Sequence, residues 1–258
     1  MMTCSGAGMG GGRGGGGGSI DISGGHVTAT SRNSGAGIGG GFLASGGTTT
    51  ISGGTIFATS EYGGAGIGGG DIGNGGNINI FGGDVTATGG TWGAGIGGGG
   101  ATLYSGEPRG SGGNIAISGG TVKAYGGDFG AGIGAGGTNT ANTHNGGTIK
   151  ITGGKVFAKG NHEGALDIGR GRNGVNGTVS INGAALAEIA NKGIDTSVTT
   201  IGTCLLRGSA AGSLLGAYLD GSKINGPLID LSSPTLESGT GYTVSGNSVT
   251  LTGIENAF

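Results

Sequence analysis

Short stretches in which apolar and polar residues alternate recur along the first two thirds of the chain. Within residues 19–23, Ile20 and Ile22 share one parity and their neighbours are polar, and after two glycines Val27 and Ala29 repeat the alternation. A period of two places successive side chains on opposite faces of a β-strand. The pattern therefore predicts pairs of short strands that are joined by a glycine corner and turn one face toward a core.

Five units of this kind follow one another, and each ends in a glycine-rich segment. The units are SIDISGGHVTATSRNSGAGIGGG, TTTISGGTIFATSEYGGAGIGGG, NINIFGGDVTATGGTWGAGIGGGG, NIAISGGTVKAYGGDFGAGIGAGG and TIKITGGKVFAKGNHEGALDIGRG. The GAGIG segments at Gly35, Gly64 and Gly93 are 29 residues apart, and the next two intervals are 37 and 34 residues. The extra residues fall at one point of the repeat, in residues 102–111 and 138–145. Insertions confined to one point are typical of a solenoid in which one corner bulges into solvent.

The glycine-rich segment adds a third strand to each unit, because Ala36 and Ile38 also share parity. Three short strands joined by glycine corners predict an all-β fold, a right-handed parallel β-helix with coils of about 29 residues. Glycine suits corners where the backbone takes a positive φ or where one coil lies flush on the next. The predicted internal columns are Ile22, Ile51, Ile80, Ile117, Ile151 and Ile181; Val27, Ile56, Val85, Val122 and Val156; Ala29, Ala58, Ala87, Ala124 and Ala158; and Ile38, Ile67, Ile96, Ile133 and Ile168.

The repeat decays toward the end of the chain. We predict glycine-rich solenoid repeats over residues 1–183, and degenerate coils with a C-terminal cap over residues 184–258. Within the cap, residues 242–252 are strand-like on both sides of Gly246-Asn247 and predict a β-hairpin. At the other end the chain starts in mid-repeat, so we expect either a piece of a longer surface protein or end-to-end stacking through an uncapped first coil.

Composition and charge narrow the function classes. The chain has 75 glycines but only three prolines and no strict third-residue glycine, which excludes collagen. A net charge of -2 predicts neither a nucleic-acid partner nor an anionic membrane, and the lack of a long apolar run predicts no membrane insertion. The first residues do not have the pattern of a signal peptide. Cys4 and Cys204 are too few and too far apart to predict a disulfide framework.

The charged and titratable residues show no catalytic pattern. The acidic residues occupy different places in their repeats, and we expect them to be solvated: Asp21, Glu61, Asp71, Asp84, Asp128 and Asp167. The histidines are also out of register: His26, His144 and His162. We therefore predict no catalytic site, no metal and no cofactor, although a polysaccharide lyase or hydrolase stays open as an alternative. The segment GGGDIGNGG around Asp71 is similar to a calcium-binding nonapeptide, but it lacks the nine-residue period and predicts a polar corner.

Three aromatic residues are the candidate ligand-binding residues. Trp92 and Phe129 directly precede GAG in consecutive units, and Tyr62 stands one residue earlier in the unit before them. A solenoid brings such residues to one edge, where flat rings suit sugar rings, which have an apolar face and a polar rim. The second interpretation is that the rings cover glycine-rich backbone.

A basic group is concentrated in the last regular coils and suggests an acidic polysaccharide as a ligand, unless it is a solvated face. Its members are Lys123, Lys150, Lys155, Lys159, Arg170 and Arg172. Ice binding is a further alternative, because outward Thr-x-Thr pairs can order water. The pairs at residues 28–30 and 86–88 fit, but the equivalent positions of the other three coils break the ladder.

The unit with consensus xIxISGGxVxAxGxxxGAGIGGG resembles glycine-rich repeats of large bacterial cell-surface proteins, which are described as carbohydrate-binding or adhesin-like. The resemblance covers residues 5–183 and brings no catalytic residues with it. It implies an extracellular or cell-surface, non-catalytic binding or scaffold module that contacts glycans or other surface components. A structural spacer or fibre is the main alternative.

Overall fold

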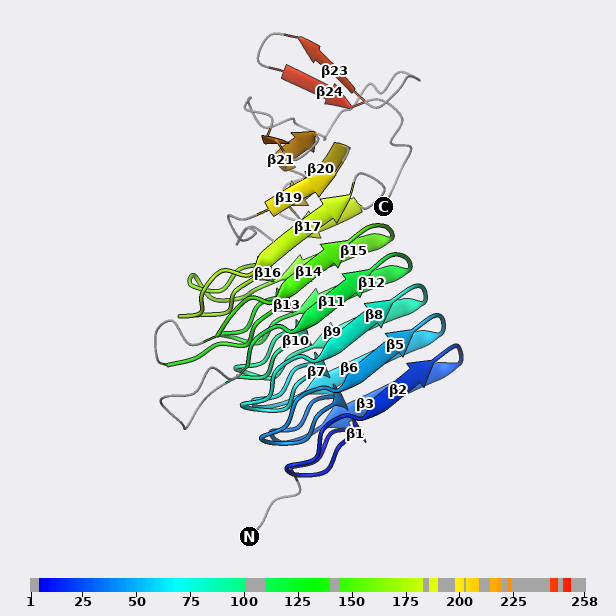
Figure 1. Cartoon of the computed structure of the whole chain (residues 1–258), viewed down its shortest axis with the longest axis vertical. Helices are drawn as coiled ribbons and strands as arrows, with labels where there is room; N and C mark the ends of the chain where they lie inside the picture. Colours follow the sequence, from blue (N-terminus) through cyan, green and yellow to red (C-terminus); the bar gives the residue numbers. More distant parts are fainter. Residues whose placement is uncertain are drawn as a thin grey trace.

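The computed structural model describes residues 5–100, 110–139 and 144–182, together with the backbone of the strands that follow. Each coil contributes one strand to each of three sheets (Figure 1). The front sheet contains β2 (Ser19–Ile22), β5 (Thr48–Ile51), β8 (Asn77–Ile80), β11 (Asn114–Ile117), β14 (Thr148–Ile151), β17 (Thr178–Asn182) and β19 (Val198–Ile201). The back sheet contains β3 (His26–Ser31), β6 (Thr55–Ser60), β9 (Asp84–Thr88), β12 (Thr121–Tyr125), β15 (Lys155–Lys159), β18 (Leu186–Ile189), β20 (Thr203–Gly208), β21 (Leu214–Leu219) and β22 (Ser222–Lys223). The narrow sheet consists of two-residue strands, β1 (Met9–Gly10), β4 (Ile38–Gly39), β7 (Ile67–Gly68), β10 (Ile96–Gly97), β13 (Ile133–Gly134) and β16 (Ile168–Gly169).

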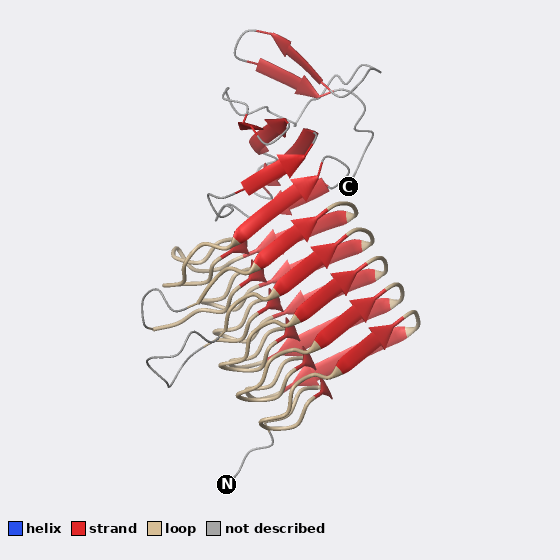
Figure 2. Ribbon diagram, in the orientation of Figure 1, coloured by secondary structure: helices blue, strands red, loops and turns tan. Residues whose placement is uncertain are grey.

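The coils form a right-handed parallel β-helix. In Figure 1 the strands of the front sheet run to the right, and the chain then passes behind them and returns through the back sheet while it climbs toward the C-terminus. Figure 2 shows the same stack with strands on two broad sides and loops gathered along one edge. No helix occurs among the described residues. The predicted fold class is therefore confirmed.

The predicted columns are confirmed residue by residue. Strand pairing places Ile22 beside Ile51, and the other members of that column follow in register up to Ile181. The columns that contain Ile38 and Ala58 are also in register from coil to coil. Almost all of these side chains are buried and form one continuous core between the sheets. The core is thin because each coil contributes a handful of small or β-branched side chains.

One glycine column explains why the short third strand ends in glycine in every coil. Gly68 and Gly97 have φ of 132°, a region that strongly favours glycine. A Cβ on either would also overlap the carbonyl group of the equivalent glycine in the next coil. Both requirements recur in each coil because the coils are stacked in register.

The C-terminal part departs from the parallel coil. β20, β21 and β22 pair antiparallel, and so do β23 (Tyr242–Ser245) and β24 (Ser248–Leu251), which form the predicted hairpin. The side chains of this part, Cys204 among them, lie outside the described structure, as does Cys4. The domain boundary near residue 184 stays a prediction.

Candidate functional site

One position per coil along the loop-rich edge is filled by a large side chain, and we call this row the edge column. It consists of Arg13, Phe42, Asp71, Trp92, Phe129 and Arg172. Each member comes from one of two loop positions that are eight residues apart, and the other position of the pair is small. The pairs are Ser5 and Arg13, Ser34 and Phe42, Gly63 and Asp71, Trp92 and Gly100, Phe129 and Gly137, and Gly164 and Arg172.

In three coils the two loop positions compete for the same space. A Cβ on Gly100 would overlap Trp92, and a Cβ on Gly137 would lie 2.5 Å from Phe129 Cβ. In the preceding coil the roles are exchanged, since a Cβ on Gly63 would lie 2.6 Å from Asp71 Cβ. In these coils the partner position must be glycine, whereas a Cβ on Gly164 would make an ordinary contact of 3.6 Å with Arg172 Cγ.

A backbone ladder fixes these loops to one another. The amide of the second position in each coil donates to the carbonyl oxygen of the first position in the coil before it. The bonds are Phe42 N to Ser5 O at 2.9 Å, Asp71 N to Ser34 O at 2.6 Å, Gly100 N to Gly63 O at 2.7 Å, Gly137 N to Trp92 O at 2.7 Å and Arg172 N to Phe129 O at 2.9 Å. The edge column is therefore part of the rigid wall of the solenoid.

Two of the three candidate aromatics stack on each other within this column. The ring centroids of Trp92 and Phe129 are 4.1 Å apart with an interplanar angle of 30°. The Phe129 ring also contacts His162 at 5.0 Å and lies 4.8 Å from the guanidinium carbon of Arg172. Both rings are partly buried, whereas Tyr62 is 49% exposed and lies outside the column. Stacked along the axis, Trp92 and Phe129 use ring faces that a sugar would need.

Two of the acidic residues are not solvated, which corrects the prediction from the sequence. Asp71 is 1% exposed and Asp167 is fully buried. Asp71 is buried because it fills the edge column beside Gly63. Asp167 accepts a hydrogen bond of 2.8 Å from Gly160 N through Oδ1, so its carboxylate has a defined place in the coil wall. Asp71 lies in a turn, as the surrounding glycines predicted, but its carboxylate is buried and not solvated.

The basic group divides over different surfaces. Strand positions place Lys123, Lys155 and Lys159 on the outer face of the back sheet, whereas Lys150 belongs to the front sheet. Arg170 and Arg172 follow β16 on the loop-rich edge. The group is thus not one charged face, and three of its six members share a surface.

The three lysines of the back sheet surround an aromatic pair, and we call this surface the basic patch (Lys123, Tyr125, Lys155, Phe157 and Lys159). In register, Lys123 lies beside Phe157 and Tyr125 lies beside Lys159. The Tyr125 and Phe157 rings are 5.5 Å apart and tilted by 51°. All three lysines are exposed, and among the described residues none has a hydrogen-bond or ion-pair partner. The charge of the patch is therefore available to a ligand.

The same outer face shows how the Thr-x-Thr ladder is interrupted. Phe57, which is 42% exposed, lies between Thr28 and Thr86 in register. Further along, Lys123 and Phe157 continue this column. The register confirms that bulky and charged residues break the ladder in three of the five coils.

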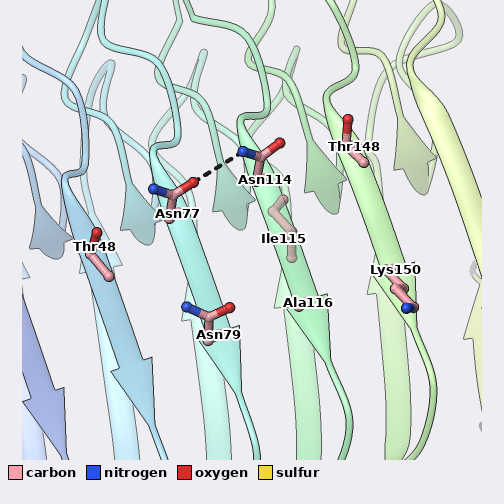
Figure 3. A pocket seen from close by; sticks show the side chains of 8 residues that line it. All are labelled: Thr48, Asn77, Asn79, Asn114, Ile115, Ala116, Thr148 and Lys150. Carbon is pink, nitrogen blue, oxygen red and sulfur yellow. Dashed lines mark hydrogen bonds between the residues drawn. The ribbon is translucent and has the colours of Figure 1, made fainter.

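The outer face of the front sheet carries a shallow hollow of about 340 Å³, which Figure 3 shows. Its lining residues are Thr48, Asn77, Asn79, Asn114, Ile115, Ala116, Thr148 and Lys150. Asn114 Nδ2 donates to Asn77 Oδ1 at 3.1 Å across neighbouring strands. Sequence reasoning missed this surface, because its residues are ordinary outward strand positions and acquire meaning only when the coils are stacked in register.

His144 is a buried histidine at the insertion corner. It is fully buried, and its Nδ1 lies 3.4 Å from Gly136 O. Burial lowers the pKa of His144 from 6.5 to about 4, because the charged imidazolium would lose its hydration. His144 is therefore neutral at physiological pH and serves as a packing element.

Within the described residues, no group of three or more His, Cys, Asp or Glu side chains could hold a metal ion. The same part of the chain contains no helix that is long and apolar enough to cross a membrane.

Comparison with known proteins agrees with the architecture. A family profile described as a beta helix repeat matches residues 20–42, 50–71, 78–100 and 115–137, each of which spans the greater part of one coil. No curated protein and no solved structure matches the chain significantly. The profile match agrees with the stacked coils that these residues consist of β-helix repeats.

Proposed function

We propose that the chain is a non-catalytic, extracellular binding module and that its basic patch binds an acidic polysaccharide. The observation that carries the proposal is the placement of three exposed, unpaired lysines around the Tyr125 and Phe157 rings. Ammonium groups attract carboxylates or sulfates, and the rings offer apolar surface to the C–H faces of the sugars.

Spacing within the patch suits an extended chain. Lys155 and Lys159 stand on either side of Phe157 along β15, separated by about 13 Å at the usual strand rise. Lys123 is one coil away, about 4.8 Å across the sheet. Because the backbone is a paired sheet, the spacing of these positions is fixed before binding. The protein backbone therefore loses little conformational entropy when the ligand binds.

An acidic residue bounds the patch on the side of the preceding coil. Asp84 of β9 is exposed and in register with Thr121 of β12. A chain with anionic groups would lie over the coils of β12 and β15 and would be repelled at the coil of β9.

The test is the affinity of the full chain for a soluble polyuronate and for uncharged dextran, measured at low and high NaCl. The triple variant Lys123→Gln, Lys155→Gln and Lys159→Gln should lose binding to the polyuronate by about tenfold or more, and wild-type binding should weaken as salt rises. The matched control is Arg32→Gln, an exposed cation that follows β3 in the first coil and belongs to no proposed site, which should bind the polyuronate like the wild type. Equal affinity of the triple variant and the wild type would refute the proposal.

The alternative function is a structural spacer, and the edge column favours it. Trp92 and Phe129 stack on each other, which is what packed covers of a glycine-rich wall would do. The variant Trp92→Ala separates the two functions of the aromatic edge. If Trp92 is a packed cover, the substitution should lower the stability and leave polyuronate binding unchanged. If Trp92 binds the ligand, the substitution should lower the affinity and change the stability little.

A further inference from the structure

We propose that the hollow on the front sheet is a second binding site, for a neutral, hydroxyl-rich polysaccharide, and that one molecule bridges this polymer to an acidic one. The bridging half of this inference rests on the proposed function of the basic patch. The second site itself rests on the shape and chemistry of the hollow.

Ala116 gives the hollow its depth. It lies in register between Asn79 of β8 and Lys150 of β14, which carry longer side chains. Strands are spaced by about 4.8 Å, so the two flanking strands are about 10 Å apart. A methyl group stands at the centre of this gap, and the longer side chains stand on its two sides (Figure 3).

The rim offers hydrogen-bonding groups that the fold leaves unused. Among the described residues, the side chains of Thr48, Asn79 and Thr148 have no hydrogen-bond partner. The bond between Asn114 and Asn77 uses one of the two Nδ2 hydrogens of Asn114 and leaves both amide hydrogens of Asn77 free. The same bond holds the two amides in fixed orientations, so the rim is ordered before a ligand arrives.

An apolar floor inside a ring of amides and hydroxyls matches the chemistry of a sugar. The C–H face of a pyranose ring would lie on Ala116, and its hydroxyl groups would exchange hydrogen bonds with the rim. Lys150 is the one charged lining residue, against five uncharged polar side chains. An ammonium group also donates hydrogen bonds to hydroxyls, so the balance favours a neutral ligand over an acidic one.

The two sites face opposite sides of the molecule. Figure 1 shows the front and back sheets on opposite sides of the stack. Their inward side chains meet in the shared core, so their outward side chains point away from each other. A polymer on the basic patch therefore leaves the hollow accessible. A rigid body with one site on each broad side holds two different polymers at a fixed distance.

The test uses beads that carry a polyuronate, to which the full chain and a fluorescent neutral glucan are added. The wild type should retain the glucan on the beads, and binding of the glucan alone should change little between low and high salt. The variant Ala116→Gln fills the hollow and should abolish glucan capture while the protein itself stays on the beads. The matched control is Thr50→Gln, two coils away in the same outward column, which should capture glucan like the wild type.

The outcomes separate the two proposals. If the protein binds the beads but captures none of a panel of neutral glucans, mannans, galactans and xylans, the second site is refuted and the basic patch stands. If the hollow prefers the polyuronate, so that Ala116→Gln weakens bead binding as strongly as the lysine triple variant, the neutral ligand is refuted. If the protein binds a neutral glucan but not the beads, the basic patch fails and the hollow stands as the site of a single-ligand protein.

Discussion

The Cβ atom of Trp92 occupies the space that a side chain on Gly100 would need. The same exclusion joins Phe129 to Gly137, and in another coil Asp71 to Gly63 with the roles exchanged. In these coils a large side chain at one loop position thus requires glycine at the other. The backbone hydrogen bonds between successive coils hold the loops at a constant distance.

This relationship predicts strong coupling between the two positions. Gly100→Ala should lower the free energy of unfolding by about 1–3 kcal/mol, because the new methyl overlaps Trp92 and the wall cannot relax. In a chain that already carries Trp92→Gly, the same change should cost clearly less, since the Trp92 side chain has gone. Urea denaturation of the two single variants and the double variant measures the coupling. Strictly additive costs would show that the positions do not share one space.

A second prediction concerns the close approach of coils at Gly95. A Cβ there would lie 2.6 Å from Tyr125 N and 2.7 Å from Gly132 O, both in the next coil. Gly95→Ala should therefore destabilise the fold by about 1–3 kcal/mol, through coil separation rather than through a forbidden φ. Gly24→Ala is the control, because a Cβ at Gly24 meets no atom within 4 Å. Thermal unfolding of both variants decides the matter, and equal midpoints would remove the contact argument.

Thr49 provides a prediction of increased stability. It stands in the inward column between Ile20 and Ile78, it is 1% exposed, and its Oγ1 has no hydrogen-bond partner within the described part of the chain. Thr49→Val keeps the shape and removes a buried hydroxyl, so it should raise the free energy of unfolding by about 1–3 kcal/mol.

The control for this change is Thr50→Val. Thr50 is the next residue on β5, and its side chain points to the outer face of the sheet. It should shift the stability by less than about 0.5 kcal/mol. A loss of stability in Thr49→Val would indicate that its hydroxyl has a partner after all.

The coil and its inner columns could be predicted from the sequence because each depends on a local rule. The alternation determines that Ile22 points inward and Asp21 outward. Because the coils stack in register, the equivalent residues of every coil have the same orientation. The edge column follows no such alternation, since Trp92 and Gly100 lie in loops. Its signal was the constant separation of eight residues, with glycine at one position whenever the other is large in the later coils.

The burial of Asp71 and the chemistry of the outer faces could not be predicted in the same way. Asp71 follows three glycines, and sequence alone gives no sign that a carboxylate takes the place of an aromatic ring in that coil. The predicted column of Ala124 and Ala158 already places Lys123 beside Phe157, and the register confirms it. The sequence does not tell whether the lysine side chains there stay exposed and without partners, because that depends on which side chains pack around them.

The last prediction concerns the pH dependence of stability, which His144 should influence. Its pKa is about 4 in the folded chain and 6.5 as a model value for the unfolded chain. Between these values the unfolded chain binds a proton at this residue and the folded chain does not, so stability should fall as the pH is lowered from about 6.5 to about 4. Above 6.5 the residue is neutral in both states and contributes no slope. The full difference corresponds to about 3 kcal/mol at 1.36 kcal/mol for each unit of pKa.

The variant His144→Gln cannot titrate, so the wild type should lose more stability than this variant between pH 7.5 and pH 4. Urea denaturation of both proteins at several pH values measures this difference, in which the titration of the carboxylates cancels. Parallel stability curves for the two proteins over this range would show that His144 is solvated and does not carry the shifted pKa.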